Sequence, residues 1–422
     1  MKIAILGFGT VGQGLPILLK KNAKKLSQIL SEELEIGKIL VRNDEKIQLL
    51  QEQNFDYDFV TTIDDVLQDD SIDTVIELMG RIEPAKTYIE QALMAGKNVV
   101  TANKDLIAEH GVELSNLAVK QNVALRYEAA VAGGIPILRA LSNSLAADEI
   151  SRVLGILNGT SNFILTKMSE ELQEFDDVLQ EAQKLGYAES DPTNDVDGFD
   201  AGYKLAILSR FAFGMALKPS DIRHSGIRQI SMQDFKIAEQ LGYTIKLVGD
   251  LQRFDDKIFG EISPAFVPKN HALATINGVK NAVFTQSFGL GDSLFSGAGA
   301  GQLPTATSVL SDLIEITKHD KKVTTFHLFD KSFQLADEND VKSAYYFNFV
   351  TADQQGQFLK LAQLFDTENA SFAQVIQEKN AENQAVISVI THEMSVKSHE
   401  NLKKKLSNLT DFDLKNTFKV LE

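Results

Sequence analysis

The sequence predicts an α/β protein with a doubly wound parallel sheet, an α+β domain in the middle of the chain and a small α+β domain at its end. Three observations support this prediction. A short apolar strand enters a glycine-rich turn and a helix at the N-terminus, and apolar strands then alternate with helical segments to about residue 127. Residues 343–422 follow the order strand, helix, strand, strand, helix. The chain has 422 residues, which is enough for two or three hydrophobic cores.

The composition excludes several classes of protein and site. A net charge of −16 argues against a nucleic acid or an anionic membrane as partner, because both attract clustered lysine and arginine. The absence of cysteine excludes disulfides, thiolate nucleophiles and cysteine-based metal sites. No apolar run reaches the ~18 residues of a membrane span, and the first residues enter a strand rather than a targeting segment. We therefore expect a cytoplasmic protein.

The first strand and turn are typical of dinucleotide binding. Lys2–Leu6 is an apolar run of the buried-strand type. The turn after it consists of Gly7, Phe8, Gly9, Thr10, Val11 and Gly12. In a Rossmann-type unit the first glycine makes the tight turn, the second lets a pyrophosphate approach, and the third packs the helix on the strand. A turn that is only structural is the alternative. We predict a dinucleotide-binding domain over residues 1–128, completed by about 300–317.

The residues after the second expected strand bear on the identity of the cofactor. This strand covers Ile36–Val41 and is followed by Arg42, Asn43 and Asp44. An acidic residue at this position binds the ribose hydroxyls of NAD, whereas an arginine suits the 2′-phosphate of NADP. Because Arg42 comes first, the sequence favours NADP, with NAD as the alternative.

Further strands of the parallel sheet are expected at Thr74–Leu78, Asn98–Thr101 and Val123–Tyr127. Thr101 and Lys104 lie at the carboxyl end of the second of these, and open α/β sheets bind their ligands beyond that edge. We therefore predict that cofactor and substrate meet at these two residues. The alternative for Lys104 is a surface lysine in the first turn of a helix, a position that the helix dipole disfavours.

The middle of the chain contains two candidate ligand sites. Residues 128–136 form a turn of small residues beside one carboxylate, Glu128, and carboxylate and carbonyl oxygens suit a hard cation. A tight crossover between domains, with Glu128 as a cap, is the alternative. The second candidate is the turn Asn158–Asn162, which follows an expected strand at Val153–Leu157. Hydroxyls and N–H groups at the start of the next helix would hold a small carboxylate.

Residues 185–204 are the segment richest in reactive side chains. Several carboxylates precede an apolar helix, and Asp200 and Lys204, four residues apart, share one face of that helix. A lysine can protonate a developing alkoxide if burial and a neighbouring cation lower its pKa toward the working pH. An ordinary ion pair on a core helix is the alternative. Our hypothesis makes Lys204 the principal acid/base group, positioned by Asp200, with Lys104 acting on the same oxygen.

The chain resembles homoserine dehydrogenase over residues 1–315 through five segments in the same order: GFGTVG, TANKDL, YEAAVAGGIPI, LNGTSNFILTKM and LGYAESDPTNDVDGFDAGYKLAIL. The resemblance, which is to the monofunctional members, implies reversible hydride transfer between NAD(P)H and L-aspartate 4-semialdehyde. The product, L-homoserine, leads to threonine, methionine and isoleucine. The lack of cysteine excludes an acylating semialdehyde dehydrogenase, which needs a thiolate. The alternative is a non-catalytic regulatory protein that responds to an amino acid and a dinucleotide.

The resemblance also implies roles for individual residues. The catalytic residues are Lys204, Lys104 and Asp200. The residues that bind substrate are Gly159, Thr160, Glu189 and Asp195, together with the two lysines. The cofactor contacts the glycine turn, Arg42, Thr101, Lys104 and Gly301. A sodium-type cation is held, mostly through backbone oxygens, by Glu128, Val131, Gly133 and Ile135. Residues 129–299 form the substrate-binding, catalytic and dimerisation domain of a homodimer or homotetramer. The glycine-rich residues 288–301 either close over the nicotinamide or serve as a hinge.

The C-terminal residues resemble a regulatory module. Residues 318–342 are charged and irregular, and we expect a linker there. Residues 343–422 resemble an ACT domain, a ferredoxin-like fold that binds amino acids, with strands expected at Tyr345–Val350, Ala373–Ile376, Ala385–Ile390 and Phe418–Leu421. The resemblance implies feedback regulation, with threonine as the usual effector. The turn Asp353–Gly356 lacks the proline that ACT domains commonly have there. A domain kept only for oligomer contacts is the alternative.

Overall fold

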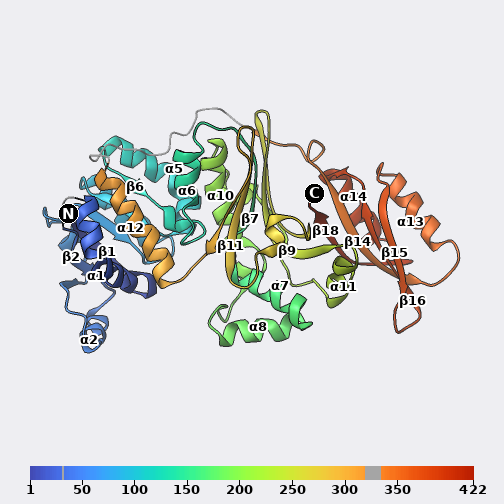
Figure 1. Cartoon of the computed structure of the whole chain (residues 1–422), viewed down its shortest axis with the longest axis horizontal. Helices are drawn as coiled ribbons and strands as arrows, with labels where there is room; N and C mark the ends of the chain where they lie inside the picture. The colour runs from blue at the N-terminus through green and yellow to red at the C-terminus, as the bar shows by residue number, and fades with distance from the viewer. Residues whose placement is uncertain (31–32, 319–333) are drawn as a thin grey trace.

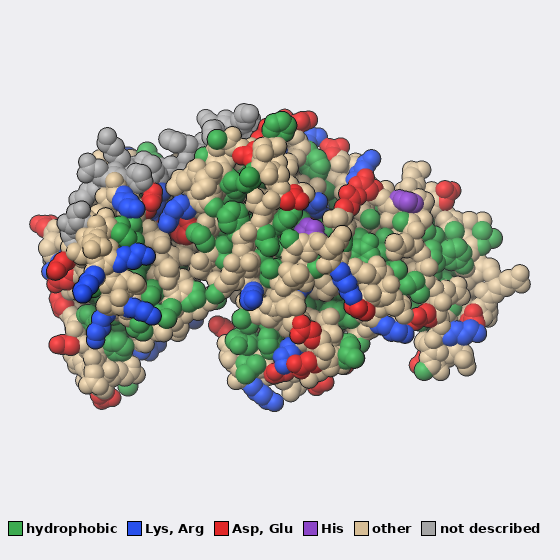
Figure 2. Space-filling model, in the orientation of Figure 1, with side chains coloured by type: hydrophobic (Ala, Val, Ile, Leu, Met, Phe, Trp, Pro, Cys, Tyr) green, Lys and Arg blue, Asp and Glu red, His purple; other side chains and the backbone are tan. Residues whose placement is uncertain are grey.

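The structure is a computed structural model that describes residues 1–30, 33–318 and 334–422. Figure 1 shows an N-terminal lobe at one end, a long sheet through the centre, and the C-terminal strands and helices at the other end. The space-filling view in Figure 2 shows a notch between the lobe that holds the N-terminus and the part that holds helices α7 and α8. Among the described helices, none is long and apolar enough to cross a membrane.

The N-terminal lobe contains the predicted parallel sheet. Its six strands lie in the order β3-β2-β1-β4-β5-β6, and every pair is parallel. The strands are β1 (Lys2–Leu6), β2 (Glu35–Leu40), β3 (Phe59–Val60), β4 (Thr74–Glu77), β5 (Asn98–Thr101) and β6 (Leu125–Arg126). This is the Rossmann order, in which the topology switches between β1 and β4, and it confirms the doubly wound sheet. The last strand is shorter than the expected Val123–Tyr127.

Helices cover the sheet, and one of them comes from far along the chain. The helices of the lobe are α1 (Thr10–Leu30), α2 (Asp44–Glu52), α3 (Ile63–Leu67), α4 (Ala85–Met94), α5 (Lys104–Gln121) and α12 (Gln302–Lys318). Val309 and Leu313 of α12 share a hydrophobic core with Ile3 and Ile5 of β1. Gly14 allows α12 to approach α1, because a Cβ at this position would lie 2.8 Å from the carbonyl oxygen of Gln302.

The middle of the chain forms a mostly antiparallel sheet in the order β12-β11-β7-β9-β10. Its strands are β7 (Ile150–Ile156), β9 (Tyr243–Phe254), β10 (Lys257–Pro268), β11 (Lys280–Ser287) and β12 (Gly291–Ala298), and β8 (Arg223–His224) and β13 (Gln334–Leu335) add to β10. The helices are α6 (Ile137–Arg139), α7 (Gly159–Glu171), α8 (Phe175–Lys184), α9 (Thr193–Val196), α10 (Phe199–Phe213) and α11 (Met232–Gln240). Most of the glycine-rich residues 288–301 form β12, which pairs with β11 along its length, and the prediction that they close over the nicotinamide or serve as a hinge stays a prediction.

The C-terminal residues follow the predicted order of strands and helices. The elements are β14 (Lys342–Ala352), α13 (Gln357–Asp366), β15 (Phe372–Lys379), β16 (Gln384–Thr391), β17 (Met394–Ser395), α14 (Val396–Ser407) and β18 (Phe412–Val420). The four long strands lie antiparallel in the order β18-β14-β16-β15. Most of the predicted linker, residues 319–333, lies outside the described residues.

The C-terminal sheet is joined to the middle sheet edge to edge. Strand β18 pairs in parallel with β10, so both belong to one twelve-stranded sheet. Aromatic rings reinforce this junction: Phe266 of β10 stacks on Tyr346 of β14 with 4.3 Å between ring centroids, and both rings pack near Phe418 of β18. The middle of the chain and its C-terminal strands therefore share a continuous backbone ladder.

Candidate active site

Two of the three predicted catalytic residues, Lys104 and Lys204, converge on the carboxylate of the third, Asp200. Asp200 lies in the first turn of α10 and is buried. One of its oxygens, Oδ2, accepts from Lys204 Nζ one helical turn later, at 2.6 Å. The other, Oδ1, lies 3.1 Å from Nζ of Lys104, the first residue of α5 in the N-terminal lobe. Asp200 therefore bridges two ammonium groups that come from different parts of the chain.

The environment of Lys204 leaves one of its protons without a bond to the described residues. Its Nζ donates to the carbonyl oxygen of Leu157 at 2.7 Å and to Asp200. An ammonium group has three N–H donors, so one remains for a ligand. The side chain of Lys204 is 11% exposed, whereas that of Lys104 is 36% exposed. Lys204 is therefore the more buried of the two cations, and Lys104 is the more exposed one.

Asn158 is a site residue that the sequence analysis did not single out. Its Nδ2 donates to Asp195 Oδ1 at 2.7 Å and to Asp200 Oδ2 at 2.8 Å. Its Oδ1 caps α7 by accepting from the backbone N–H of Ser161 at 2.7 Å. The cap can be recognised in the sequence, since asparagine is a favoured N-cap residue. The two carboxylate partners cannot, because they lie in another segment.

The predicted substrate residues are only partly assembled. Gly159 is the first residue of α7, and Thr160 Oγ1 donates to the carbonyl oxygen of Tyr187 at 2.6 Å. Asp195 is held by Asn158 beside the catalytic cluster. Glu189 is exposed, and no hydrogen bond or ion pair ties its carboxylate to the described residues. The prediction that Glu189 holds the substrate stays a prediction.

The charges of the cluster fix its protonation. Burial opposes ionisation of Asp200, but Lys204 and Lys104 outweigh it and hold its pKa at about 2. Burial would lower the pKa of Lys104, but the attraction of Asp200 and Asp105 outweighs that effect and raises it. The pKa of Lys104 is therefore not lowered, because its nearest charged neighbours are carboxylates. Its ammonium is charged at neutral pH and can act as a proton donor or an electrostatic stabiliser.

The glycine turn fits a pyrophosphate. Gly7 has a φ of +93°, and a Cβ there would lie 2.8 Å from the carbonyl oxygen of Leu78. A Cβ at Gly12 would lie 2.6 Å from the carbonyl oxygen of Gly7. At Gly9, in contrast, a Cβ would meet nothing within 4 Å. Gly7 and Gly12 are thus required by the fold itself, whereas Gly9 borders open space beside the N-terminus of α1.

Phe8 contributes to the turn through its backbone alone. Its ring is buried, and it packs edge-on against Phe55 at 5.2 Å and near Tyr57 and Phe59. The prediction that Phe8 binds the cofactor is therefore restricted to its main chain. Thr10 is exposed and Val11 is half-buried, and they are the first two residues of α1.

The remaining predicted cofactor residues lie at the edges of the same sheet. Arg42 lies two residues after the end of β2, is exposed, and has no hydrogen bond or ion pair with the described residues. Thr101 ends β5 and donates to Glu77 Oε2 at 2.6 Å. Burial raises the pKa of Glu77, which the sequence analysis did not single out although it ends β4. Gly301, with a φ of +120°, directly precedes α12.

The Glu128 side chain is a helix cap. Its two oxygens accept from the backbone N–H groups of Leu138 and Arg139, at 2.8 and 2.9 Å. Its own N–H donates to Asp312 at 2.9 Å. Burial raises the pKa of Glu128 to about 7 and that of Asp312 to about 6. The carboxylate thus acts as a cap, which was the alternative to a cation ligand. A nearby cation would favour the ionised forms of Glu128 and Asp312.

The other predicted cation ligands lie in a compact turn. Gly133 has a φ of +51°, its carbonyl oxygen accepts from Ser308 Oγ at 2.7 Å, and a Cβ there would overlap the backbone of Gly299. The carbonyl oxygen of Ile135 accepts from the N–H of Ile137 at 2.8 Å, and Val131 is buried. No group of three or more His, Cys, Asp or Glu side chains in the described ranges could hold a metal. A cation here would have to bind the second lone pairs of main-chain oxygens.

Comparison with known proteins gives matches over the whole chain. Residues 7–128 match the family model described as "Homoserine dehydrogenase, NAD binding domain", and residues 136–314 match the model "Homoserine dehydrogenase". The homoserine dehydrogenase of Lactococcus lactis is 55% identical and covers 100% of this chain and 99% of its own length.

Solved structures agree with the sequence matches. The crystal structure of a homoserine dehydrogenase from Thiobacillus denitrificans superposes with a TM-score of 0.93 at 35% identity, covering 100% of this chain and 98% of the other. A hyperthermophilic archaeal homoserine dehydrogenase in complex with NADPH covers 75% of this chain and 98% of its own, with a TM-score of 0.64 at 29% identity. The chain belongs to the homoserine dehydrogenase family.

Proposed function

We propose that the chain catalyses the reversible NAD(P)H-dependent reduction of L-aspartate 4-semialdehyde to L-homoserine. The observation that carries this proposal is the pair of lysines held by Asp200, with Lys204 Nζ at 2.6 Å and Lys104 Nζ at 3.1 Å. Two ammonium groups facing one ligand position suit the oxygen of an aldehyde, which becomes negatively charged during reduction. A regulatory protein without catalysis would not need this arrangement.

In this proposal, a side chain of the protein supplies the proton that the reduced aldehyde oxygen takes up. When bound, the nicotinamide supplies the hydride that adds to the aldehyde carbon. Lys204 points its remaining N–H at the carbonyl oxygen and transfers that proton to the alkoxide as it forms. Lys104 stabilises the same oxygen by its charge, and Asp200 keeps both ammonium groups in place. In the reverse direction neutral Lys204 accepts the proton of the homoserine hydroxyl.

The other end of the substrate carries an ammonium group and a carboxylate. The site offers a negatively charged group for the first and N–H donors for the second. Asp195, held by Asn158 at 2.7 Å, is placed to accept from the substrate ammonium group. The N-terminus of α7, with Gly159 and Thr160, is placed to bind the carboxylate. Glu189 would join the ammonium site by turning inward from solvent.

The exposed guanidinium of Arg42 supports NADP as the cofactor, because the 2′-phosphate would give it a partner of opposite charge. The archaeal relative in complex with NADPH points the same way. A monovalent cation, sodium by its preference for oxygen ligands, would bind the main-chain oxygens of Glu128, Val131, Gly133 and Ile135. The two buried carboxyl groups with raised pKa values beside this turn support a positive charge there.

The C-terminal residues would form an ACT domain that regulates the enzyme. The strand order β18-β14-β16-β15, with helices between β14 and β15 and between β16 and β18, supports the ferredoxin-like fold. Threonine remains the expected effector. A homodimer or homotetramer is supported by the position of β12 at the edge of its sheet among the described strands, and by Phe288 in the turn before β12, which is 93% exposed. A cytoplasmic location stays a prediction from the sequence.

One assay tests the proposal. The oxidation of NADPH and of NADH is followed with L-aspartate 4-semialdehyde as substrate, with and without L-threonine. We expect turnover with at least one cofactor, faster with NADPH. No oxidation of either cofactor would refute the proposal and favour the regulatory alternative.

A further inference from the structure

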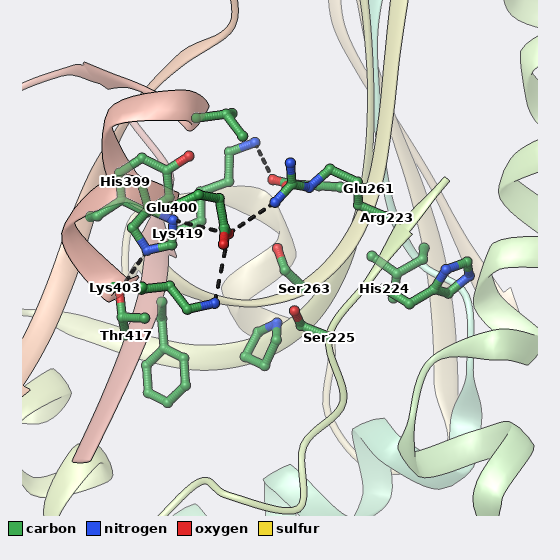
Figure 3. A pocket seen from close by; sticks show the side chains of 15 residues that line it. Arg223, His224, Ser225, Glu261, Ser263, His399, Glu400, Lys403, Thr417 and Lys419 are labelled. Carbon is green, nitrogen blue, oxygen red and sulfur yellow. Dashed lines mark hydrogen bonds and ion pairs between the residues drawn. The ribbon is translucent and has the colours of Figure 1, made fainter. Parts of the chain in front are cut away.

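A buried carboxylate at the end of β4 has no cation beside it. Two other buried carboxylates are paired with lysine: Figure 3 shows Glu261 of β10 beside Lys419, at 2.6 Å, and Asp200 bridges the two lysines of the candidate active site. Glu77, in contrast, is fully buried and forms no ion pair with the described residues. Because an unpaired buried charge is costly, its carboxylate depends on hydrogen bonds from its surroundings, and these show what it holds in place.

One oxygen of Glu77 holds the loop that follows β4. Oε1 accepts from the backbone N–H groups of Met79, at 2.7 Å, and of Gly80, at 3.3 Å. Two consecutive residues of this loop lie in the left-handed region, Gly80 with a φ of +70° and Arg81 with a φ of +62°. Since few residues other than glycine adopt this conformation, the surroundings must hold the loop in this shape.

The same loop borders the glycine turn. A Cβ at Gly7 would lie 2.8 Å from the carbonyl oxygen of Leu78 and 3.1 Å from the Cα of Met79. Strand β4 is the neighbour of β1 at the point where the strand order reverses, and dinucleotides bind at this point in doubly wound sheets. Glu77 therefore fixes a loop that packs directly on the predicted cofactor turn.

The other oxygen of Glu77 leads to Lys104. Oε2 accepts from the hydroxyl of Thr101 at 2.6 Å, and Thr101 Oγ1 in turn accepts from the N–H of Asn103 at 3.0 Å. Asn103 is the N-cap of α5, and its Nδ2 donates to the carbonyl oxygen of Arg81 at 2.6 Å. Lys104 is the next residue and the first of α5. The network thus joins the loop after β4 to the helix that carries this lysine.

We propose that Glu77 is a positioning residue that sets the place of the Lys104 ammonium relative to the cofactor turn. Because Glu77 is fully buried, it acts through the loop after β4 and through the N-cap of α5. Lys104 depends on this support, because its side chain is 36% exposed and a second carboxylate, Asp105, lies 3.8 Å from its Nζ. If the start of α5 shifts, Lys104 can leave Asp200 and pair with Asp105 alone. A misplacement of about 1 Å in an active site can cost about a hundredfold in rate.

Replacing Glu77 by glutamine tests the proposal by kinetics. Glu77→Gln keeps the shape of the side chain, but its amide nitrogen, turned toward Thr101, cannot accept from the hydroxyl. At saturating NADPH we expect kcat with the semialdehyde to fall about ten- to a hundredfold. Glu174→Gln, at the exposed N-cap of α8, is the matched control and should keep the wild-type kcat. An unchanged kcat in Glu77→Gln would overturn the proposal.

A double-variant cycle separates positioning from general damage to the fold. If Glu77 acts through Lys104, Glu77→Gln should change kcat by less than about threefold in a protein that already carries Lys104→Met. Damage that does not involve Lys104 would lower kcat by the same factor in both backgrounds, and this outcome would contradict the proposed role.

Asn103→Ser tests the same network without touching the buried carboxylate. Serine is also a favoured N-cap residue, but its shorter side chain cannot reach the carbonyl oxygen of Arg81. We expect kcat to fall at least about tenfold while the melting temperature falls by no more than about 4 °C. A folded Asn103→Ser variant with the wild-type kcat would count against the proposal even if Glu77→Gln did not fold.

The kinetic readouts rest on the proposed dehydrogenase reaction, whereas chemical labelling of lysine does not. Burial alone would lower the pKa of Lys104, but its pairing with Asp200 and Asp105 raises it, so little of the neutral amine that reacts is present. Reductive methylation followed by mass spectrometry should label Lys104 at least about threefold faster in Glu77→Gln than in wild type. Lys184, an exposed lysine of α8, should react equally in both.

The labelling result and the assay of turnover fail in different ways. Equal labelling of Lys104 in wild type and Glu77→Gln would show that its ammonium has not moved, and this would overturn the positioning role. If wild type shows no turnover with the semialdehyde, the proposed function fails, while the labelling of Lys104 still decides whether Glu77 positions it.

Discussion

Replacing Lys204 by methionine tests the proposed proton donor. Methionine keeps most of the side-chain volume and has no ammonium group. A positioned general acid contributes about 10² to 10⁴ in rate, so we expect kcat/KM for the semialdehyde to fall by that factor. This loss corresponds to about 2.7–5.4 kcal/mol of transition-state stabilisation.

The structure indicates that this variant will fold. The carbonyl oxygen of Leu157 keeps a second donor, Asn281 Nδ2, at 2.8 Å. Asp200 keeps Asn158 at 2.8 Å and Lys104 at 3.1 Å. Because neither acceptor is left without a partner, the free energy of unfolding should fall by only about 1–3 kcal/mol. Thermal unfolding followed by circular dichroism checks this expectation.

The assay follows the absorbance of reduced nicotinamide at several semialdehyde concentrations. Lys184→Met, at an exposed lysine in the last turn of α8, is the matched control and should retain wild-type kinetics. A folded Lys204→Met variant that loses less than about tenfold in kcat/KM, or ~1.4 kcal/mol, would refute the assignment.

Three further predictions concern the cofactor and the cation. Gly9→Ala should fold normally but raise the KM for NADPH at least about tenfold, whereas Gly12→Ala should lower the melting temperature; equal stability losses would contradict the open space at Gly9. Arg42→Ala should raise the KM for NADPH several-fold and leave that for NADH unchanged, and an equal effect on both would exclude a phosphate contact. Raised pKa values, to about 7 for Glu128 and about 6 for Asp312, mean that the folded state holds these protons more tightly than the unfolded state. Their stabilising contribution is full below about pH 4 and is lost as the pH rises through 6 to 7. Sodium chloride should therefore raise the melting temperature more at pH 8 than at pH 5, relative to choline chloride, and equal shifts would argue against a cation beside Glu128.

Local patterns predicted the elements and one side of the active site. The apolar runs and the glycine turn predicted five of the six strands of the parallel sheet, because strands and helices differ in the spacing of their apolar residues, but they did not predict the two-residue strand β3. The spacing of Asp200 and Lys204 gave their shared helix face for the same reason. Lys104 was placed by the rule that ligands bind at the carboxyl ends of parallel strands, and its Nζ lies 3.1 Å from Asp200. These predictions needed no long-range contact.

Long-range contacts are what sequence reasoning missed. Asn158 bridges Asp195 and Asp200, and no periodicity links an N-cap to carboxylates in another segment. For Glu128 the sequence left a cation site and a cap as alternatives, and its carboxylate caps backbone N–H groups ten and eleven residues later. The choice between these roles depends on the direction of one side chain, which the residue type does not set.

The sequence contains a signal for the junction between β10 and β18, and our sequence analysis did not use it. Lys419 stands between Phe418 and Val420 in an expected strand, and a lysine is almost never fully buried unless it is paired. A lysine within a buried strand therefore implies a carboxylate partner on a neighbouring strand, and here Asp250 and Glu261 provide it at 2.7 and 2.6 Å. Both carboxylates belong to the middle sheet, so Lys419 ties the C-terminal strands to it. Removal of the C-terminal residues would leave Glu261 without its cation, which costs more than an ordinary surface ion pair is worth. The C-terminal part thus supports the fold of the catalytic half whether or not it also binds an effector.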